Sequence, residues 1–329
     1  MKKFVLATLI LLLTGKFSFS QINKPEPLRL MYATINATVS HLWVAKEAGI
    51  FRKNNLDVEI LYGAQRTIES LIAGEIALVE IAGPVPIAAR LAGADIVLLT
   101  ASINAFPFSF VVSPEIGSYE KLKGKVLGVT RFGASSDVAL RMSLQKVGID
   151  PNGDVRIIQA GGFQELYAAM EKGAISGALF GPPILTLLKT KGFRELMDLR
   201  TLGIETQHTG LVARRAFVKD RADTVRRFVE SYVEGIHRLK TDKEFSLKVI
   251  SKNTKVTNRD VLEEAYNFYA LKYIRSVPTP SLAGVKTILE QLALKNPKAE
   301  TANPEDFVDF RFVNELEKSG FIAKLYKHP

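Results

Sequence analysis

Leu71-Ile72-Ala73-Gly74-Glu75-Ile76 ends a helical segment and leads into an apolar run that stops at Gly83-Pro84. The chain repeats this pattern 99 residues later, where Met170-Glu171-Lys172-Gly173-Ala174-Ile175 leads to Gly181-Pro182. In both copies a glycine follows the helical residues, as is usual at a helix C-terminus, and a short β-type run comes next. A solenoid would repeat at a shorter period, so the sequence predicts two lobes of one α/β architecture.

Short β-type runs alternate with helical segments around both copies, which is typical of a mainly parallel sheet with crossover helices. Around the first copy we expect strands at 28–32, 57–61, 76–81 and 95–101, and helices at 42–48, 67–73 and 85–91. Around the second we expect strands at 125–130, 155–158 and 175–180, and helices at 137–147 and 164–171. Extended passages connect the copies at 104–112 and 202–212. Beyond residue 217 the pattern is helical, at 224–240, 243–252, 259–274, 282–295 and 304–318.

The predicted fold is therefore α/β, with two lobes built on mainly parallel sheets and a hinge made of two crossings. The expected division is a signal peptide at 1–20, a first lobe of 21–108 and 206–329 that includes the helical tail, and a second lobe of 109–205. Two crossings between lobes allow a cleft to open and close. Ligands bind beyond the carboxyl ends of such strands, near helix N-termini, so the cleft is the expected binding site.

The N-terminus has the three parts of a secretory signal peptide. Lys2 and Lys3 are basic, residues 4–13 are apolar, and Ser18-Phe19-Ser20 places small residues before a cleavage at Gln21. A membrane helix is the alternative, but it needs about 20 apolar residues, roughly twice this run. We therefore expect a periplasmic protein, although an uncleaved or surface-retained form stays open.

The net charge does not indicate a polyanionic partner. The chain has 44 Lys and Arg against 34 Asp and Glu, a net +10, which becomes +7 without residues 1–20. Basic and acidic residues alternate, as in Lys46-Glu47 and Asp242-Lys243-Glu244, which is the pattern of solvated helix faces. A nucleic-acid surface would gather its basic residues on one element, so we expect no nucleic-acid partner.

The absence of cysteine excludes thiol nucleophiles, cysteine metal sites, disulfides and a lipid anchor. No two of the four histidines stand at helical ligand spacing, so we expect no metal and no cofactor. The chain also lacks the serine-hydrolase, zinc-protease and phosphate-loop motifs. We expect a binding protein rather than an enzyme, and a secreted metal-free enzyme or a ligand sensor on the same fold is the alternative.

One stretch resembles a known family. Val44-Ala45-Lys46-Glu47-Ala48-Gly49-Ile50-Phe51-Arg52-Lys53-Asn54-Asn55-Leu56-Asp57-Val58-Glu59 resembles the opening of the nitrate, sulfonate and taurine type solute-binding proteins of ABC importers. That group is similar to binders of thiamine-pyrimidine precursors. Further matches at 72–77, 91–97 and 122–129 follow in the same order, and the resemblance covers nearly the whole mature chain.

The resemblance implies a type 2 periplasmic-binding-protein fold. It also implies a monomer that captures a small organic or anionic molecule between its lobes and delivers it to an ABC permease in the inner membrane. The identity and charge of the ligand are left open, because related proteins bind many small molecules.

Candidate ligand contacts in the first lobe follow the predicted strands. Thr34, Asn36 and Thr38 lie in the first loop, and His41 lies in the helix after it. Thr38 could instead only cap that helix. The other first-lobe candidates are Gln65, Arg66, Ala82 and Gly83. Arg66 could bind a carboxylate, sulfonate or nitrate through two hydrogen bonds, or lie in solvent, while 82–83 could be a plain turn.

In the second lobe, Arg131, Ser135, Ser136 and Asp137 open a helix where backbone N–H groups and hydroxyls can hold an anion or a polar group. Alternatively, Ser136 or Asp137 only caps the helix, and the Asp137 charge would repel an anion. Further candidates at the corresponding cleft positions are Phe106, Phe108, Gly162, Phe163, Phe180, Gly181, Pro182 and Gln207, which is followed by His208 and Thr209. The aromatic side chains could hold a ring or fill the core.

Overall fold

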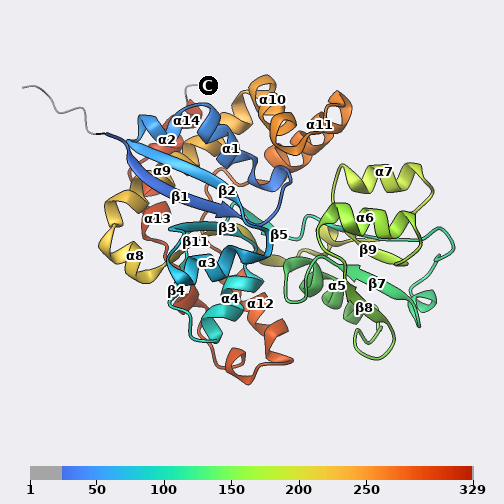
Figure 1. Cartoon of the computed structure of the whole chain (residues 1–329). Coiled ribbons are helices and arrows are strands. Elements are labelled where there is room, and N and C mark those ends of the chain that lie inside the picture. The colour runs from blue at the N-terminus through green and yellow to red at the C-terminus, as the bar shows by residue number, and fades with distance from the viewer. Residues whose placement is uncertain (1–23, 328–329) are drawn as a thin grey trace, which may run out of the picture.

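The computed structural model describes residues 24–327, which form two β-sheets flanked by helices (Figure 1). The predicted signal peptide at 1–20 lies outside the described residues. Within residues 24–327, every helix is too short or too polar to cross a membrane.

The first sheet has the strand order β2-β1-β3-β11-β4, and β5 pairs with β11 at its side. Its strands are β1 (Glu26–Tyr32), β2 (Leu56–Tyr62), β3 (Leu78–Ile81), β4 (Ile96–Leu98), β5 (Ile103–Ala105) and β11 (Glu205–Arg214). β1 runs parallel to β2 and β3, as the alternation of strands and helices predicts. β11 is the returning crossing, and it runs antiparallel to β3, β4 and β5.

The second sheet has the order β10-β6-β9-β7-β8. Its strands are β6 (Ser109–Val112), β7 (Val126–Val129), β8 (Arg156–Gln159), β9 (Gly177–Phe180) and β10 (Arg194–Asp198). β7 is parallel to β8 and β9, whereas β6, the first crossing, is antiparallel to β9 and β10. The two sheets therefore share one plan, with parallel strands supplemented by an antiparallel crossing strand.

Helices cover both sheets. Those before the return crossing are α1 (Ser40–Glu47), α2 (Ile50–Lys53), α3 (Thr67–Ala73), α4 (Pro84–Leu91), α5 (Ser135–Lys146), α6 (Phe163–Glu171) and α7 (Ile184–Thr190). Those after it are α8 (Arg215–Asp220), α9 (Ala222–Thr241), α10 (Lys243–Thr254), α11 (Arg259–Ala265), α12 (Leu282–Ala293), α13 (Arg311–Lys318) and α14 (Phe321–Lys327). The glycines of the repeat, Gly74 and Gly173, have φ of 81° and 68°, the left-handed geometry that ends a helix.

Two predicted tail helices differ from the structure. The helix predicted at 259–274 consists of α11 followed by a π-helix, Tyr266–Tyr273. The helix predicted at 304–318 is interrupted, because a 3-10 turn at Pro304–Phe307 is followed by extended residues before α13. The turn begins with Pro304, and the Asn303 side chain caps it by accepting a hydrogen bond from the Glu305 N–H. The turn is therefore a separate element and not the first part of α13.

The buried apolar side chains divide into cores that belong to one sheet or the other. Two cores contain only residues from 106–204 and lie on the two faces of the second sheet, against α5 and against α6 with α7. Two others contain only residues outside this range and lie on the two faces of the first sheet. We call residues 106–204 the second-sheet unit and the remaining described residues the first-sheet unit.

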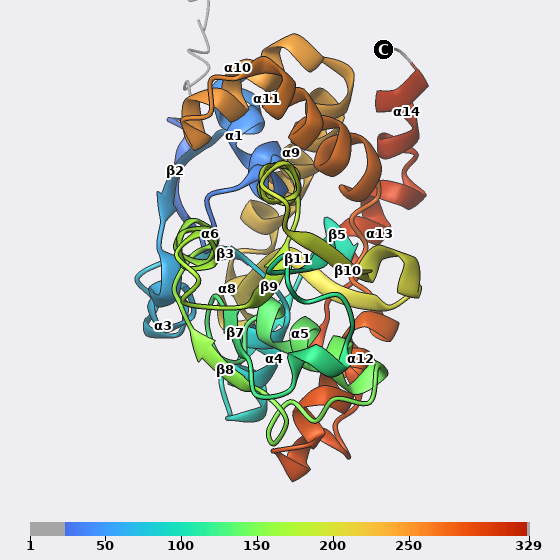
Figure 2. The same cartoon turned by 90° about the vertical axis from the view of Figure 1, so that its right-hand side faces the viewer.

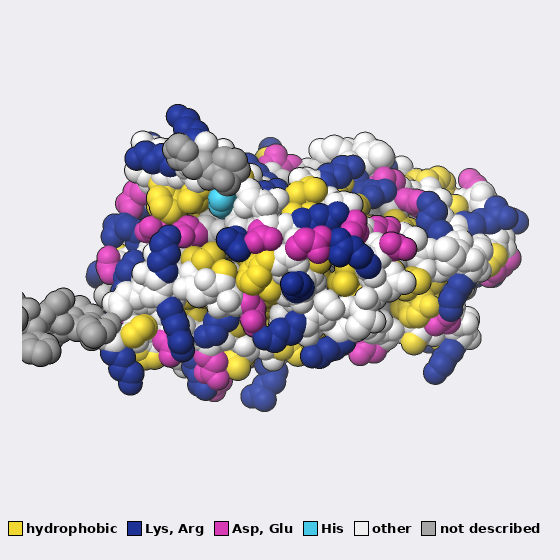
Figure 3. All heavy atoms as spheres, turned by 90° about the horizontal axis from the view of Figure 1, so that it is seen from above, with side chains coloured by type: hydrophobic (Ala, Val, Ile, Leu, Met, Phe, Trp, Pro, Cys, Tyr) yellow, Lys and Arg dark blue, Asp and Glu magenta, His cyan; other side chains and the backbone are white. Residues whose placement is uncertain are grey.

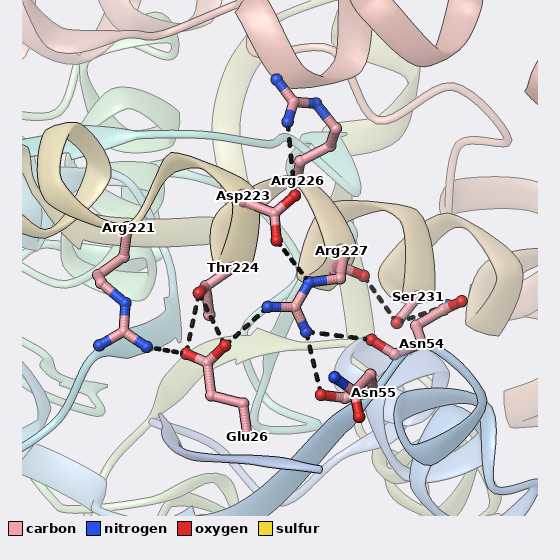
Figure 4. Close-up of polar contacts among 9 residues, drawn as sticks. All are labelled: Glu26, Asn54, Asn55, Arg221, Asp223, Thr224, Arg226, Arg227 and Ser231. Atoms are coloured by element: carbon pink, nitrogen blue, oxygen red, sulfur yellow. Dashed lines mark hydrogen bonds and ion pairs between the residues drawn. The ribbon is translucent and has the colours of Figure 1, made fainter. Parts of the chain in front are cut away.

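A polar network attaches the first strand to the tail helices (Figure 4). The Glu26 carboxylate accepts hydrogen bonds from Arg227 Nη2 at 2.7 Å, from Thr224 Oγ1 at 2.9 Å, and from Arg221. Burial would raise the pKa of Glu26, but these hydrogen bonds and the arginine charges outweigh it and lower the pKa. Arg227 also donates to the backbone carbonyl of Asn55 at 3.0 Å, so α9 holds the start of β1 and the start of β2 together.

Candidate ligand-binding site

The two units meet where the chain crosses between the sheets. α5 of the second-sheet unit lies against α4 and α12 of the first-sheet unit (Figure 2). Gly83 is the N-cap residue of α4 and donates its backbone N–H to the Gln207 carbonyl of β11 at 2.9 Å. A Cβ atom at Gly83 would lie 2.4 Å from that carbonyl oxygen, so only glycine fits without a shift. The predicted contacts Gly83 and Gln207 are thus adjacent at this junction.

The Gln207 side chain is already bound within the protein. Its Nε2 donates to the Thr100 carbonyl at 2.7 Å, and its Oε1 accepts from the Ser281 N–H at 3.0 Å. The side chain is fully buried. Gln207 therefore fixes the return crossing to the neighbouring segments, and its amide is not available to a ligand in this arrangement.

His208 follows Gln207, but unlike the Gln207 amide its ring keeps one nitrogen without a hydrogen bond within residues 24–327. Its Nδ1 lies 2.7 Å from Thr209 Oγ1, while its buried Nε2 has no hydrogen-bond partner among the described residues. Burial lowers the pKa of His208 to about 3, so the imidazole is neutral at neutral pH. The ring packs 5.3 Å from Phe108, which in turn lies 5.8 Å from Phe163. The site thus offers aromatic faces beside one neutral polar nitrogen.

The start of α5 supplies a second buried polar atom of this kind. Ser135 Oγ is buried and has no partner among residues 24–327. Ser136 Oγ instead accepts the Thr130 N–H at 3.0 Å, and the two side-chain hydroxyls lie 2.7 Å apart. Asp137 accepts from the Gly133 N–H at 2.9 Å and from Arg141 Nε at 2.7 Å. Ser136 and Asp137 therefore hold the loop that precedes α5, whereas α5 itself has Ala134 at its N-cap and no side-chain cap from residues 24–327, so the capping alternative is wrong in detail. Of these three residues, Ser135 alone has a hydroxyl without a partner in the described part of the chain.

The loop after β1 is bound to itself. Asn36 caps a 3-10 turn, Ala37–Val39, by accepting the Thr38 N–H at 2.9 Å, and the Thr38 hydroxyl also bonds to Asn36. Thr34 accepts the Asn36 N–H at 3.2 Å. Thr34 and Asn36 are half-buried, so part of each side chain is still exposed. The conformation of this loop is set by its own hydrogen bonds.

His41 lies in a buried polar cluster on the α1 and α9 side of the first sheet. Its Nε2 is 3.4 Å from Glu80 Oε1, and its ring is 4.4 Å from that of Tyr232. Tyr232 donates to Glu80 at 2.7 Å, and burial together with the Glu80 charge raises the pKa of Tyr232, which keeps this proton in place. Ser102 donates to Glu80 at 3.4 Å and lies 3.2 Å from the carbonyl of Thr209. Through Ser102 the cluster is hydrogen-bonded to Thr209 of the return crossing, next to His208.

Among the described residues, no three His, Asp or Glu side chains are grouped so that they could hold a metal ion. Near the crossings, a buried imidazole lies beside the Phe108 ring, which in turn lies beside Phe163. Residues 36–244 match the family model described as NMT1/THI5 like, which is more than half of the chain. The chain belongs to the NMT1/THI5-like family.

Individual relatives are more distant. YtlA of Bacillus subtilis (strain 168), named as a binding protein, is 25% identical over 197 residues, or 58% of this chain and 59% of that protein. The alkanesulfonate-binding protein SsuA of Xanthomonas axonopodis pv. citri, bound to MOPS, has a TM-score of 0.70 at 20% identity, covering 85% of this chain and 96% of that one. The nitrate-binding protein NrtA of Synechocystis PCC 6803 has a TM-score of 0.69 at 16% identity, covering 89% and 88%.

A desulfurization enzyme, DSZB, is also similar, with a TM-score of 0.63 at 15% identity, covering 89% of this chain and 99% of that one. At these identities the likeness concerns the fold. It confirms the predicted two-sheet α/β fold of periplasmic binding proteins for this NMT1/THI5-like chain.

The remaining predicted contacts of the NMT1/THI5-like chain are dispersed. Phe106 and Phe180 are buried in the two cores of the second-sheet unit, where they fill space between sheet and helices. Arg66 is exposed at the end of a 3-10 turn, Ala64–Arg66, which also contains Gln65. The rest lie at turns and helix starts: Ala82 before α4, Arg131 before α5, Gly162 capping α6, and Gly181 and Pro182 after β9.

One residue of this region was not singled out from the sequence, and a second was named only by its place beside Gln207. Glu80 stands in an otherwise apolar strand, Leu78–Ile81, and a carboxylate in such a run is the signal that could have marked it. His208 lies in β11, in which Thr206–Ala213 are all buried. Its place in the extended return crossing was noted, but its role depends on which atoms surround it.

Proposed function

We propose that this NMT1/THI5-like protein is a periplasmic solute-binding protein that captures a small organic or anionic molecule at the junction of its two units and delivers it to an ABC importer. The family match over residues 36–244 carries the proposal. The names of the similar proteins, which bind alkanesulfonates and nitrate, support a small-molecule ligand.

The chemistry of the junction supports the same proposal. Ser135 Oγ and His208 Nε2 are buried polar atoms without partners among the described residues. A buried polar group without a hydrogen bond costs about 1 to 3 kcal/mol, so a ligand that supplies the missing partner gains affinity. The rings of Phe108 and Phe163 add an apolar surface beside them.

We propose further that the two units act as lobes, with 106–204 as the second lobe, which is within three residues of the predicted 109–205, and with the crossings near β5, β6 and β11 as the hinge. A ligand that touches both lobes binds the closed arrangement more tightly and shifts the population toward it. The permease would then distinguish the closed form, and the protein would act as a monomer without turnover.

The ligand is identified by native mass spectrometry of freshly purified mature protein, followed by a thermal-shift panel of sulfonates, nitrate, aromatic acids and pyrimidines. A ligand that co-purifies and raises the melting temperature supports the proposal. Incubation of that compound with excess protein, followed by mass spectrometry, separates binding from catalysis. Conversion of the compound over many turnovers would show that the protein is an enzyme and would contradict the proposal.

Ser135→Ala should weaken binding by about tenfold, because the variant loses one hydrogen bond to a buried group. Isothermal titration calorimetry with the identified ligand measures the change. The matched control is Ser143→Ala, since Ser143 is buried in the same helix but donates to its own backbone, at Ala139 O, at 2.7 Å. Equal affinities of Ser135→Ala and the parent would place the ligand elsewhere.

A further inference from the structure

Tail residues that lie beyond the family match at 36–244 contact the second-sheet unit. Thr186 of α7 donates its hydroxyl to the Glu264 carboxylate of α11. The Arg200 guanidinium lies 5.2 Å from the centre of the Phe268 ring in the π-helix. Hydrogen bonds to Asp198 raise the pKa of Arg200, so this group keeps the positive charge that a cation–π contact needs.

A third contact joins the same two segments. The position of a Cβ atom on Gly181 would be 2.4 Å from the Tyr269 hydroxyl and 2.7 Å from the Pro107 carbonyl oxygen. Gly181 therefore allows the π-helix to approach the turn after β9 more closely than any other residue would. Tyr269 is buried, with 4% of its surface exposed, so it is enclosed between the tail and this turn.

Around these contacts the two units do not pack continuously. A groove of about 1010 Å³ lies between α7 and the segment formed by α11 and the π-helix. Its walls come from both units, with Leu185 and Lys189 on one side and Asp260 and Asn267 on the other. Seen from above, acidic and basic side chains alternate over this part of the molecule (Figure 3). In this region the units are therefore held by a few separate contacts rather than by continuous packing.

We propose that Glu264, Phe268 and Tyr269 form a clasp that holds the second-sheet unit in the arrangement of this structure through Thr186, Arg200 and Gly181. A contact that exists in only one arrangement of two units favours that arrangement by its own free energy. The clasp therefore sets the balance between the arrangements independently of any ligand. On the tail side of the clasp, Phe268 and Tyr269 lie in a π-helix, and Glu264 lies in α11 just before it. π-Helical turns are frequent at functional sites.

The absence of cysteine from the chain makes a direct test possible. Ile72→Cys in α3 and Lys172→Cys after α6 place spin labels on exposed sites in the two units, away from the clasp. Double electron–electron resonance on the purified protein without added ligand then measures the distances between the units. In the labelled parent we expect one main population that matches the distance in this structure.

In the double variant Thr186→Val with Phe268→Leu, we expect a second distance population, enriched at least about tenfold over the parent. Gly181→Ala tests the third contact separately, because its added methyl group displaces Tyr269, and it should enrich the same population. Circular dichroism melting curves show whether each variant is folded, and Thr186→Val alone keeps the test available if the double variant does not fold.

Two control variants remove similar contacts within one unit. Thr190→Val changes the same helix, but the Thr190 hydroxyl donates to Leu187 O of α7 at 2.8 Å. Phe245→Leu removes a ring that lies 5.2 Å from Arg238 within the first-sheet unit. Both should give the parent distribution. The clasp is refuted if the parent lacks the population of this structure, if the clasp variants match the parent, or if the controls change equally. None of these results depends on the ligand, so the proposed function stands or falls separately.

Discussion

At the scale of single residues, the junction combines neutral polar atoms with aromatic faces. The buried His208 keeps its imidazole uncharged, since burial lowers its pKa to about 3. The carboxylate of Asp137, which would repel an anion, is paired with Arg141 and with a backbone N–H. Among residues 24–327, the two unpartnered atoms that we propose for a ligand are the Ser135 hydroxyl and the neutral His208 Nε2. Such groups can hold either an uncharged ligand or the oxygen atoms of an anion.

The burial of His208 predicts a pH-dependent stability. Its pKa is about 3 in the folded protein against about 6.5 when unfolded, so the unfolded chain binds more protons between these values. The contribution of His208 to the free energy of unfolding is therefore fully present above pH 6.5 and is lost as the pH falls toward 3. Between pH 7 and pH 5 the free energy of unfolding should fall by about 2 kcal/mol from this group.

Urea unfolding at pH 7 and pH 5 measures this loss, and His208→Gln should remove most of it. His237→Gln is the control, because His237 is only half-buried, and burial lowers its pKa as well. It should leave most of the pH dependence intact. If His208→Gln and the parent lose the same free energy between the two pH values, the imidazole is not buried as the structure has it.

Residue types predicted where the candidate residues lie in the fold better than the contacts that each of them makes. Thr34, Gly83 and Ser135 follow strand ends, and this placement came directly from the alternation of strands and helices. The sequence could not distinguish Ser135 from Ser136, because the difference lies in a hydrogen bond that Ser136 accepts from the Thr130 N–H, six residues earlier. Phe180 illustrates the same limit, since an aromatic residue near a cleft and one in a core have the same local sequence.

At the scale of elements, short-range signals predicted most of the boundaries. The helix predicted at 67–73 is observed with these bounds, because Gly74 ends it in the left-handed conformation. β10 was missed, since Arg194-Glu195-Leu196-Met197-Asp198 is largely charged and does not look like a strand. It forms because Arg194 and Asp198 pair with the two ends of β6, which is a contact over more than 80 residues.

The approach of α4 to β11 can be tested at Gly83. Gly83→Ala places a methyl group 2.4 Å from the Gln207 carbonyl oxygen, and backbone atoms on both sides cannot move aside easily. We expect a loss of about 1 to 3 kcal/mol in the free energy of unfolding, which urea titration measures. Gly117→Ala is the control, because its added methyl group would come no closer than 3.5 Å to a flexible Arg194 side chain. The two variants should differ by more than 1 kcal/mol, and equal stabilities would contradict the close approach.

At the scale of the whole molecule, the order of strands depends on contacts that local patterns do not contain. The repeat predicted two similar units, and both sheets do contain three parallel strands joined by an antiparallel crossing strand. The place of β11 between β3 and β4 could not be predicted, because an apolar strand is equally suited to several positions in a sheet. The last strand of the first-sheet unit therefore comes after the whole second-sheet unit in the sequence.

This order predicts that the units differ in their ability to fold alone. The second-sheet unit is continuous in sequence and has its own cores on both faces of its sheet, and about 100 residues is a common domain size. Residues 104–206, expressed alone, should therefore unfold cooperatively in urea and give a dispersed NMR spectrum. Residues 24–105 are the control: they lack β11, which pairs with β3, β4 and β5, and α9, which packs on α1. This fragment should remain unfolded, because its sheet would lack the strand that joins β4 and β5 to β3, and one face would lose its cover. A folded 24–105 fragment, or an unfolded 104–206 fragment, would mean that the two units depend on one another more than their separate cores indicate.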